Sequence, residues 1–125
     1  MKDIENRDDI KFLVDEFYKQ VVNDDIIGLF FTKVAKLDFE KHLPVMYDFW
    51  ETTLLGNWKY KGNPMVKHIQ LNELEPLNPE HFERWLQLWE ETLFKHFSGP
   101  TSEEALKKAK QISKLMQFKI QQQIR

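Results

Sequence analysis

Four histidines are the side chains of this sequence best suited to binding a metal or a polar ligand: His42, His68, His81 and His96. On base rates each is an ordinary helix residue. His96 falls in the last turn of a predicted helix, where a positive charge suits the helix dipole, and His81 falls in a first turn that should be solvated. His42 and His68 differ, because both neighbour apolar or aromatic stripes on separate helices. Such a pair could bracket a flat apolar ligand, with one imidazole binding a metal and the other facing its open coordination position.

Tyr18 and Trp85 could extend this site, because each carries a polar hydrogen on an otherwise apolar helix face. A buried tyrosine hydroxyl or tryptophan N–H normally has a hydrogen-bond partner. For either residue alone, the simpler interpretation is a core side chain bonded to a backbone carbonyl. Together with His42, however, the two residues would form a cluster of donors around one ligand atom. Spacing alone leaves both interpretations open.

Other catalytic chemistry has little support in the sequence. The chain contains no P-loop, no G-x-G-x-x-G, no G-x-S-x-G and no H-E-x-x-H motif, and its serines have no histidine–acid pattern beside them. It has no cysteine, which excludes disulfides, thiolate metal sites and covalent haem attachment through C-x-x-C-H. Its aromatic content of 14% suits either a ring-rich core or a cavity for a large flat ligand.

Length and charge predict one small domain, covering residues 1–125. The net charge of −2 provides no long-range attraction to nucleic acid or to an anionic membrane. The stretch MKDIENRDDIKF is too charged for a secretory signal peptide, and no apolar run approaches the length of a membrane span. We therefore expect a cytoplasmic protein that binds neither nucleic acid nor a membrane. The modest charge, and the lack of an obvious spare apolar helix face, favour a monomer.

The candidate residues should lie on helices. Apolar side chains recur at helical spacing along the chain, and no segment alternates convincingly as a strand. The predicted helices cover about residues 10–21, 26–35, 38–55, 65–71, 79–97 and 101–120, so the fold class is all-α. We expect Asp8 or Asp9 to be the N-cap of the first helix and Gly56 to be the C′ residue of the third. Asn78-Pro79-Glu80 should start the fifth helix, and Thr101-x-x-Glu104 should form a capping box for the last. Pro44 either occupies the first turn of the third helix or bends that helix.

Four segments together resemble the truncated haemoglobins, specifically their third group. They are EFYKQV with Tyr18, HLPVMYDFWETTLLG from His42, Y-x-G-x-P-x-x-x-H from Tyr60, and FERWLQLWEETL from Phe82. The chain has no Gly-Gly dipeptide, in agreement with a group that lacks the paired-glycine motifs of the others. The resemblance covers about residues 10–118 and implies a truncated globin fold, a two-over-two helical sandwich around a haem.

The resemblance also implies a role for each matching residue. His68 corresponds to the proximal histidine that binds the haem iron, and Tyr18, His42 and Trp85 correspond to the polar residues of the distal pocket. The remaining expected haem contacts are Phe31 and Met46 on the porphyrin, and Tyr60 and Lys67 near the propionates, with Arg84 as a further candidate there. The loop NELEPLN after His68 is somewhat long for the family, which leaves the pocket edge there undefined.

These roles lead us to expect a noncovalent haem b with five-coordinate iron that reversibly binds O₂, NO or CO. A donor-rich pocket would stabilise the partial negative charge on bound O₂. The alternative is a haem enzyme for NO dioxygenation or peroxide chemistry, which would need a separate reductase because no reductase domain is fused to this chain. We favour ligand binding over a dedicated enzyme. A helical interaction module without haem is the third hypothesis.

Overall fold

The computed structural model describes residues 1–28, 39–57 and 77–124. Four helices form this part of the chain: α1 (Arg7–Val22), α2 (Phe39–Leu55), α4 (Pro79–His96) and α5 (Pro100–Ile124). The all-α prediction is therefore confirmed. The predicted helix over residues 65–71, and most of the one over 26–35, lie outside the described residues. Among those described, no helix is long and apolar enough to span a membrane.

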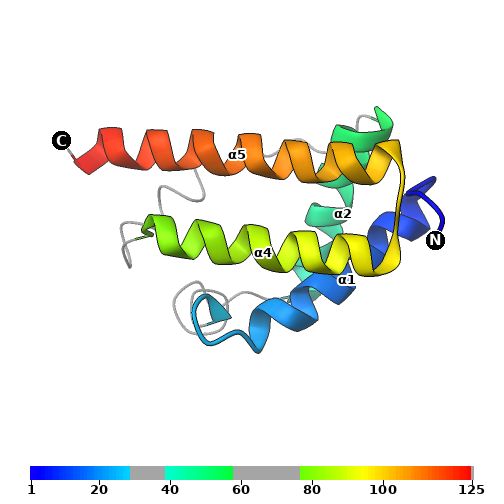
Figure 1. The fold of residues 1–125 in the computed structure, drawn as a ribbon, viewed down its shortest axis with the longest axis horizontal. Coiled ribbons are helices and arrows are strands. Elements are labelled where there is room, and N and C mark those ends of the chain that lie inside the picture. The colour runs from blue at the N-terminus through cyan, green and yellow to red at the C-terminus, as the bar shows by residue number, and fades with distance from the viewer. Residues whose placement is uncertain (29–38, 58–76, 125) are drawn as a thin grey trace.

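The helices pack as two pairs. Helices α4 and α5 run antiparallel and side by side, and α1 and α2 cross them (Figure 1). Contacts join α1 to α2 and to α4, while α2 also reaches α5. The largest core cluster contains side chains from all four helices, so the two pairs share one apolar interior.

Helix α1 follows its apolar period closely. The residues predicted to face the core are all buried: Ile10, Leu13, Val14, Phe17, Tyr18 and Val21. The predicted N-cap was wrong, because Asn6 caps this helix with its side chain, which accepts a hydrogen bond from the Asp9 N–H at 3.0 Å. Asp8 and Asp9 instead lie in the first turn, where their negative charges suit the positive end of the helix dipole.

Helix α2 ends at Leu55, and Gly56 follows with a φ of +76°, as expected for a C′ glycine. Pro44 lies inside the helix beyond its first turn, so it removes one backbone hydrogen bond from the helical ladder. The stripe at helical spacing from His42 consists of one buried residue, Trp50, and four half-buried ones, His42, Met46, Phe49 and Thr53. The stripe is therefore only partly covered by the described residues.

The turn between α4 and α5 brings the N-terminal segment onto the start of α5. Helix α4 begins at Asn78-Pro79-Glu80, as predicted. The predicted capping box was wrong, because α5 already includes Thr101 and its cap comes from Asp3. The Asp3 carboxylate accepts hydrogen bonds from the N–H groups of Thr101 and Ser102, each at 2.8 Å, and from the Ser102 hydroxyl at 2.6 Å. Gly99 has a φ of +141°, and a Cβ there would lie 2.6 Å from the Asp3 side chain.

The Asp3 cap should make stability depend on pH. Burial by itself raises the pKa of Asp3. The hydrogen bonds from Ser102, Thr101 and Ile4 together outweigh burial, so the pKa falls from 3.8 to about 2. Because the folded pKa is depressed, the contribution is present above the unfolded value and is lost as the pH falls from 3.8 towards about 2. We expect Asp3→Ala to lower the free energy of unfolding by about 0.5–2 kcal/mol at neutral pH. Urea titrations should show this difference shrinking at acid pH, and a difference independent of pH would contradict the capping role.

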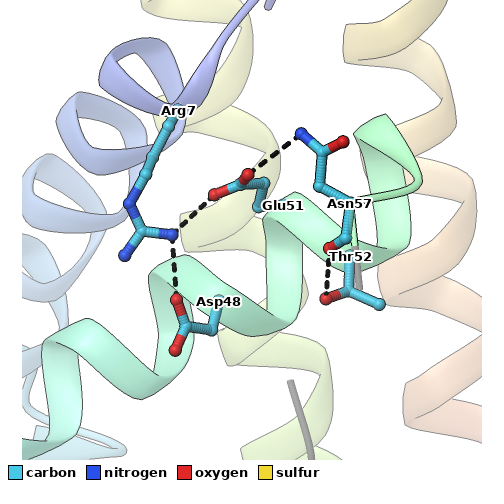
Figure 2. Close-up of polar contacts among 5 residues, drawn as sticks. All are labelled: Arg7, Asp48, Glu51, Thr52 and Asn57. Atoms are coloured by element: carbon cyan, nitrogen blue, oxygen red, sulfur yellow. Dashed lines mark hydrogen bonds and ion pairs between the residues drawn. The ribbon is translucent and has the colours of Figure 1, made fainter. Parts of the chain in front are cut away.

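A polar cluster fastens the start of α1 to the end of α2 (Figure 2). The Arg7 guanidinium pairs with Glu51 at 2.6 Å and with Asp48 at 2.8 Å. The Glu51 side chain is only 6% exposed, and its second oxygen accepts from the Asn57 amide at 3.0 Å. Thr52 donates to the Asn57 carbonyl oxygen at 2.9 Å, which holds the residue after Gly56 against the helix.

Replacing Arg7 by Met should leave the buried Glu51 carboxylate without its cation. We expect a loss of about 1–3 kcal/mol in the free energy of unfolding, below the value for a fully enclosed pair because Arg7 is half-exposed. Lys19→Met provides the matched control, since the Lys19–Glu16 pair is on the surface and its loss should change the free energy of unfolding little. Urea unfolding of both variants makes the comparison. Equal losses would show that the cluster contributes no more than a surface ion pair.

Candidate ligand-binding site

Tyr18 on α1 and His42 on α2 meet across the interface between their helices. The Tyr18 hydroxyl oxygen lies 3.0 Å from His42 Nε2, and the two rings are edge to face with centroids 5.4 Å apart. Burial raises the pKa of Tyr18 above its ordinary value, so its phenol stays protonated at neutral pH. In one histidine tautomer the phenol donates to Nε2. In the other, Nε2–H donates to the phenol oxygen.

Trp85 on α4 belongs to the same neighbourhood. The Phe17 ring packs edge-on against Tyr18 and against Trp85, with centroid distances of 5.3 Å and 6.0 Å. Trp85 is half-buried, and no hydrogen bond joins its indole N–H to a described residue. Trp89, one turn later, donates its own N–H to the Ala105 carbonyl at 3.2 Å. The core interpretation considered for Trp85 therefore fits Trp89, and the Trp85 N–H can donate to a ligand.

The remaining site predictions have mixed outcomes. Met46 lies one turn after His42 and is half-buried against the main core cluster. Arg84, the further propionate candidate, pairs with Asp24 at 2.7 Å and also donates to Gln87. The other four predicted haem contacts lie outside the described residues: Phe31, Tyr60, Lys67 and His68.

The two histidines given ordinary roles have ordinary surroundings. His81 accepts a hydrogen bond from the Asn78 N–H at 3.1 Å, so it helps to cap α4. His96 lies in the last turn of that helix and packs edge-on against Phe12 at 4.9 Å. Neither ring is needed for the site formed by Tyr18 and His42.

Sequence reasoning did not find the arrangement of tryptophans beside this site. Trp85 and Trp89 are nearly parallel, at 6° and with centroids 6.3 Å apart, and Trp50 of α2 stacks on Trp89 at 4.5 Å and 20°. The i, i+4 spacing of Trp85 and Trp89 places them on one helix face. Nothing local in the sequence indicates that Trp50 continues the row from another helix.

The described residues around Tyr18 and His42 combine polar atoms with apolar side chains. The phenol, the imidazole and the indole N–H supply polar atoms, while Met46 and Phe17 supply apolar surface around them. Such a mixture of a few convergent donors in an apolar surround is typical of cofactor sites.

Comparisons with known proteins identify the family of the chain. A family model described as bacterial-like globin matches residues 3–119. The chain belongs to the bacterial-like globins. The globin is 34% identical over 91 residues to the group 3 truncated hemoglobin ctb of Campylobacter jejuni, which covers 70% of this chain and 69% of that protein. It also matches the crystal structure of the group III truncated hemoglobin from C. jejuni with a TM-score of 0.83 and 31% identity, over 96% of this chain and 95% of the other.

The comparisons confirm the family and fold predicted from the sequence. The globin is all-helical and matches a truncated hemoglobin over nearly its whole length. Membership of the family implies haem binding. The assignment of individual site residues stays a prediction.

Proposed function

We propose that this globin is a single-domain protein that binds haem b noncovalently through His68 and reversibly binds O₂, NO or CO on the face formed by Tyr18, His42 and Trp85. The observation that carries the proposal is the Tyr18–His42 contact at 3.0 Å, with Phe17 packed against both Tyr18 and Trp85. When bound, haem supplies an iron with one open coordination position for a diatomic gas. The protein then determines how tightly that gas is held.

The distal side chains stabilise a ligand that carries partial negative charge. A protonated phenol and an indole N–H are fixed donors, and they act in a partly desolvated site where hydrogen bonds are stronger than in water. His42 fixes the orientation of the phenol, and its tautomer selects whether Tyr18 donates to the ring or to the ligand. Met46 and Phe31 exclude water from the haem faces, and Tyr60 and Lys67 bind the acidic edge of the haem.

A haemin titration tests the proposal directly. We expect one equivalent of haemin to produce a sharp Soret band, and reduction under CO to shift that band as expected for a ligand-binding haem. His81→Ala should behave identically, because the His81 ring accepts a hydrogen bond at the start of α4 and is not one of the proposed haem contacts. A protein that stays colourless with added haemin would rule out haem binding and every ligand role derived from it.

A second function has support from the same contact. The Tyr18 phenol and the His42 imidazole are already hydrogen-bonded, so they can pass a proton to a polarised ligand during NO dioxygenation or peroxide chemistry. Turnover would require electrons from a separate reductase. Sustained NO consumption with a reductase present would favour this enzyme, whereas a single turnover would favour reversible binding. In either case we propose that the globin acts as a cytoplasmic monomer.

A further inference from the structure

Three tryptophans form a continuous row from the candidate ligand site into the core. Trp85 lies at the site end, Trp89 in the middle and Trp50 at the far end, on a different helix. Trp89 and Trp50 are almost completely buried, at 1% and 4% exposure, whereas Trp85 is half-buried. Only the site end of the row is therefore substantially open.

The rings are oriented for electron exchange. Neighbouring indoles are near-parallel, at 6° and 20°, rather than edge to face. Trp50 and Trp89 lie closest, with centroids 4.5 Å apart, and Trp85 is offset from Trp89, with centroids 6.3 Å apart. Edge-to-face contacts are common among packed aromatic rings, and Phe17 adopts them against both Trp85 and Trp89. Indole is also among the most easily oxidised side chains in proteins. A row of stacked indoles can therefore pass a positive hole from ring to ring.

The hydrogen bond of Trp89 favours onward transfer of the positive hole over its trapping on Trp89. An oxidised indole loses its N–H proton readily when a base is near, and the neutral radical then stays in place. The Trp89 N–H donates to the Ala105 backbone carbonyl, which is a very weak base. The oxidised ring therefore keeps its proton and remains able to take an electron from Trp50.

Tyr47 provides an end point for the row. It precedes Trp50 by three residues on α2, which places the two side chains on neighbouring turns of one face. Its hydroxyl donates to Asp15 of α1, and Arg7 and Lys11 lie over its ring at 5.9 Å and 5.7 Å. These cations oppose a positive charge on the ring, so oxidation of Tyr47 must expel the phenol proton. Asp15 is in place to accept that proton.

The resting state of Tyr47 agrees with such a role. Burial, then the hydrogen bond and negative charge of Asp15, raise the pKa of Tyr47 to about 12, while Arg7 lowers it slightly. The phenol therefore carries its proton until an electron is removed.

We propose that Trp85, Trp89, Trp50 and Tyr47 form a hole-transfer relay that carries oxidising equivalents away from the ligand site. The proposal rests on the proposed haem function, which supplies the one-electron oxidant when a hydroperoxide reacts in the pocket. The oxidant takes one electron from Trp85, Trp85 takes one from Trp89, and Trp89 takes one from Trp50. Trp50 then takes one electron from Tyr47, whose proton moves to Asp15. The products are the oxidant reduced by one electron, a neutral tyrosyl radical and a protonated Asp15.

Freeze-quench electron paramagnetic resonance of the haem-loaded protein after hydrogen peroxide tests the relay. We expect a tyrosyl signal that narrows when the protein contains ring-deuterated tyrosine and that is lost in Tyr47→Phe. Trp89→Phe and Trp50→Phe should each remove this signal, because the first breaks both ring contacts of the row and the second breaks the Trp50–Trp89 contact. Phe12→Leu is the control for loss of an aromatic ring, since Phe12 contacts His96 and Phe97 and not the row.

The outcomes separate the relay from the haem proposal. Each variant is first shown to load haem and to release O₂ as the native protein does. A normal haem spectrum with a tyrosyl signal that persists in Tyr47→Phe, or in both tryptophan variants, would overturn the relay alone. If Trp89→Phe unfolds, Trp50→Phe still tests the contact between Trp50 and Trp89. Absence of the Soret band would instead overturn the haem function.

Discussion

Tyr18→Phe should release O₂ at least about tenfold faster than the native globin. The substitution removes only the hydroxyl, so the buried ring keeps its packing against Phe17. A hydrogen bond to a ligand with partial charge contributes about 1.5–3 kcal/mol in a partly desolvated site, and about 1.4 kcal/mol corresponds to one decade in rate. Trp85→Phe should have a similar effect through loss of the indole N–H. Together the two changes should accelerate release by about two to four decades, provided that the two donors act independently.

The chain offers matched controls for both substitutions. Trp89→Phe makes the same change one turn along α4, but its N–H already serves the Ala105 carbonyl, so O₂ release should not change. Tyr47→Phe is the equivalent control for Tyr18, since its hydroxyl donates to Asp15. Stopped-flow displacement of O₂ by CO measures all four variants. Native release rates in both Tyr18→Phe and Trp85→Phe would remove the distal donors from the proposed function.

His68→Ala should abolish the haem spectrum or weaken haem retention severely. The imidazole that described residues supply beside Tyr18 is that of His42, and it would have to give up the Tyr18–His42 contact to replace His68 as a ligand. His81→Ala and His96→Ala remove an imidazole from positions with structural contacts, so both proteins should stay red. Haem transfer to an acceptor apoglobin, followed by absorption, provides the rate of loss.

Added imidazole separates ligation from folding in the His68 experiment. A His68→Gly variant should regain its Soret band when imidazole enters the space left by the side chain, because the free ring restores the missing ligand. A destabilised fold would not recover in this way. A His68→Ala protein with native haem retention would show that another residue binds the iron.

Local periodicity predicted the helices better than their ends. The core face of α1 was predicted completely because six apolar residues follow one period. Its N-cap was wrong because Asn6, Asp8 and Asp9 are all good capping residues, and only the backbone conformation decides among them. The cap of α5 could not be predicted, since its acceptor, Asp3, lies 98 residues from Thr101 and no local pattern encodes that pairing.

The candidate site was also predicted only in those features that depend on local sequence. Spacing placed Tyr18, His42 and Trp85 on apolar faces, but their proximity depends on how three helices cross, and only the family resemblance indicated it. Sequence also gave no basis for distinguishing the indoles of Trp85 and Trp89. The distinction arises from the Ala105 carbonyl, which α5 brings beside Trp89 and not beside Trp85.

The bond between Asp3 and the start of α5 has a consequence for biosynthesis. Asp3 leaves the ribosome long before Thr101 and Ser102, so the nascent chain carries a carboxylate whose partners on α5 do not yet exist. Most of the chain must therefore be made before its first segment can be fastened. A stalled or truncated translation product without α5 would present that segment to proteases, and we expect it to be degraded faster than the complete globin.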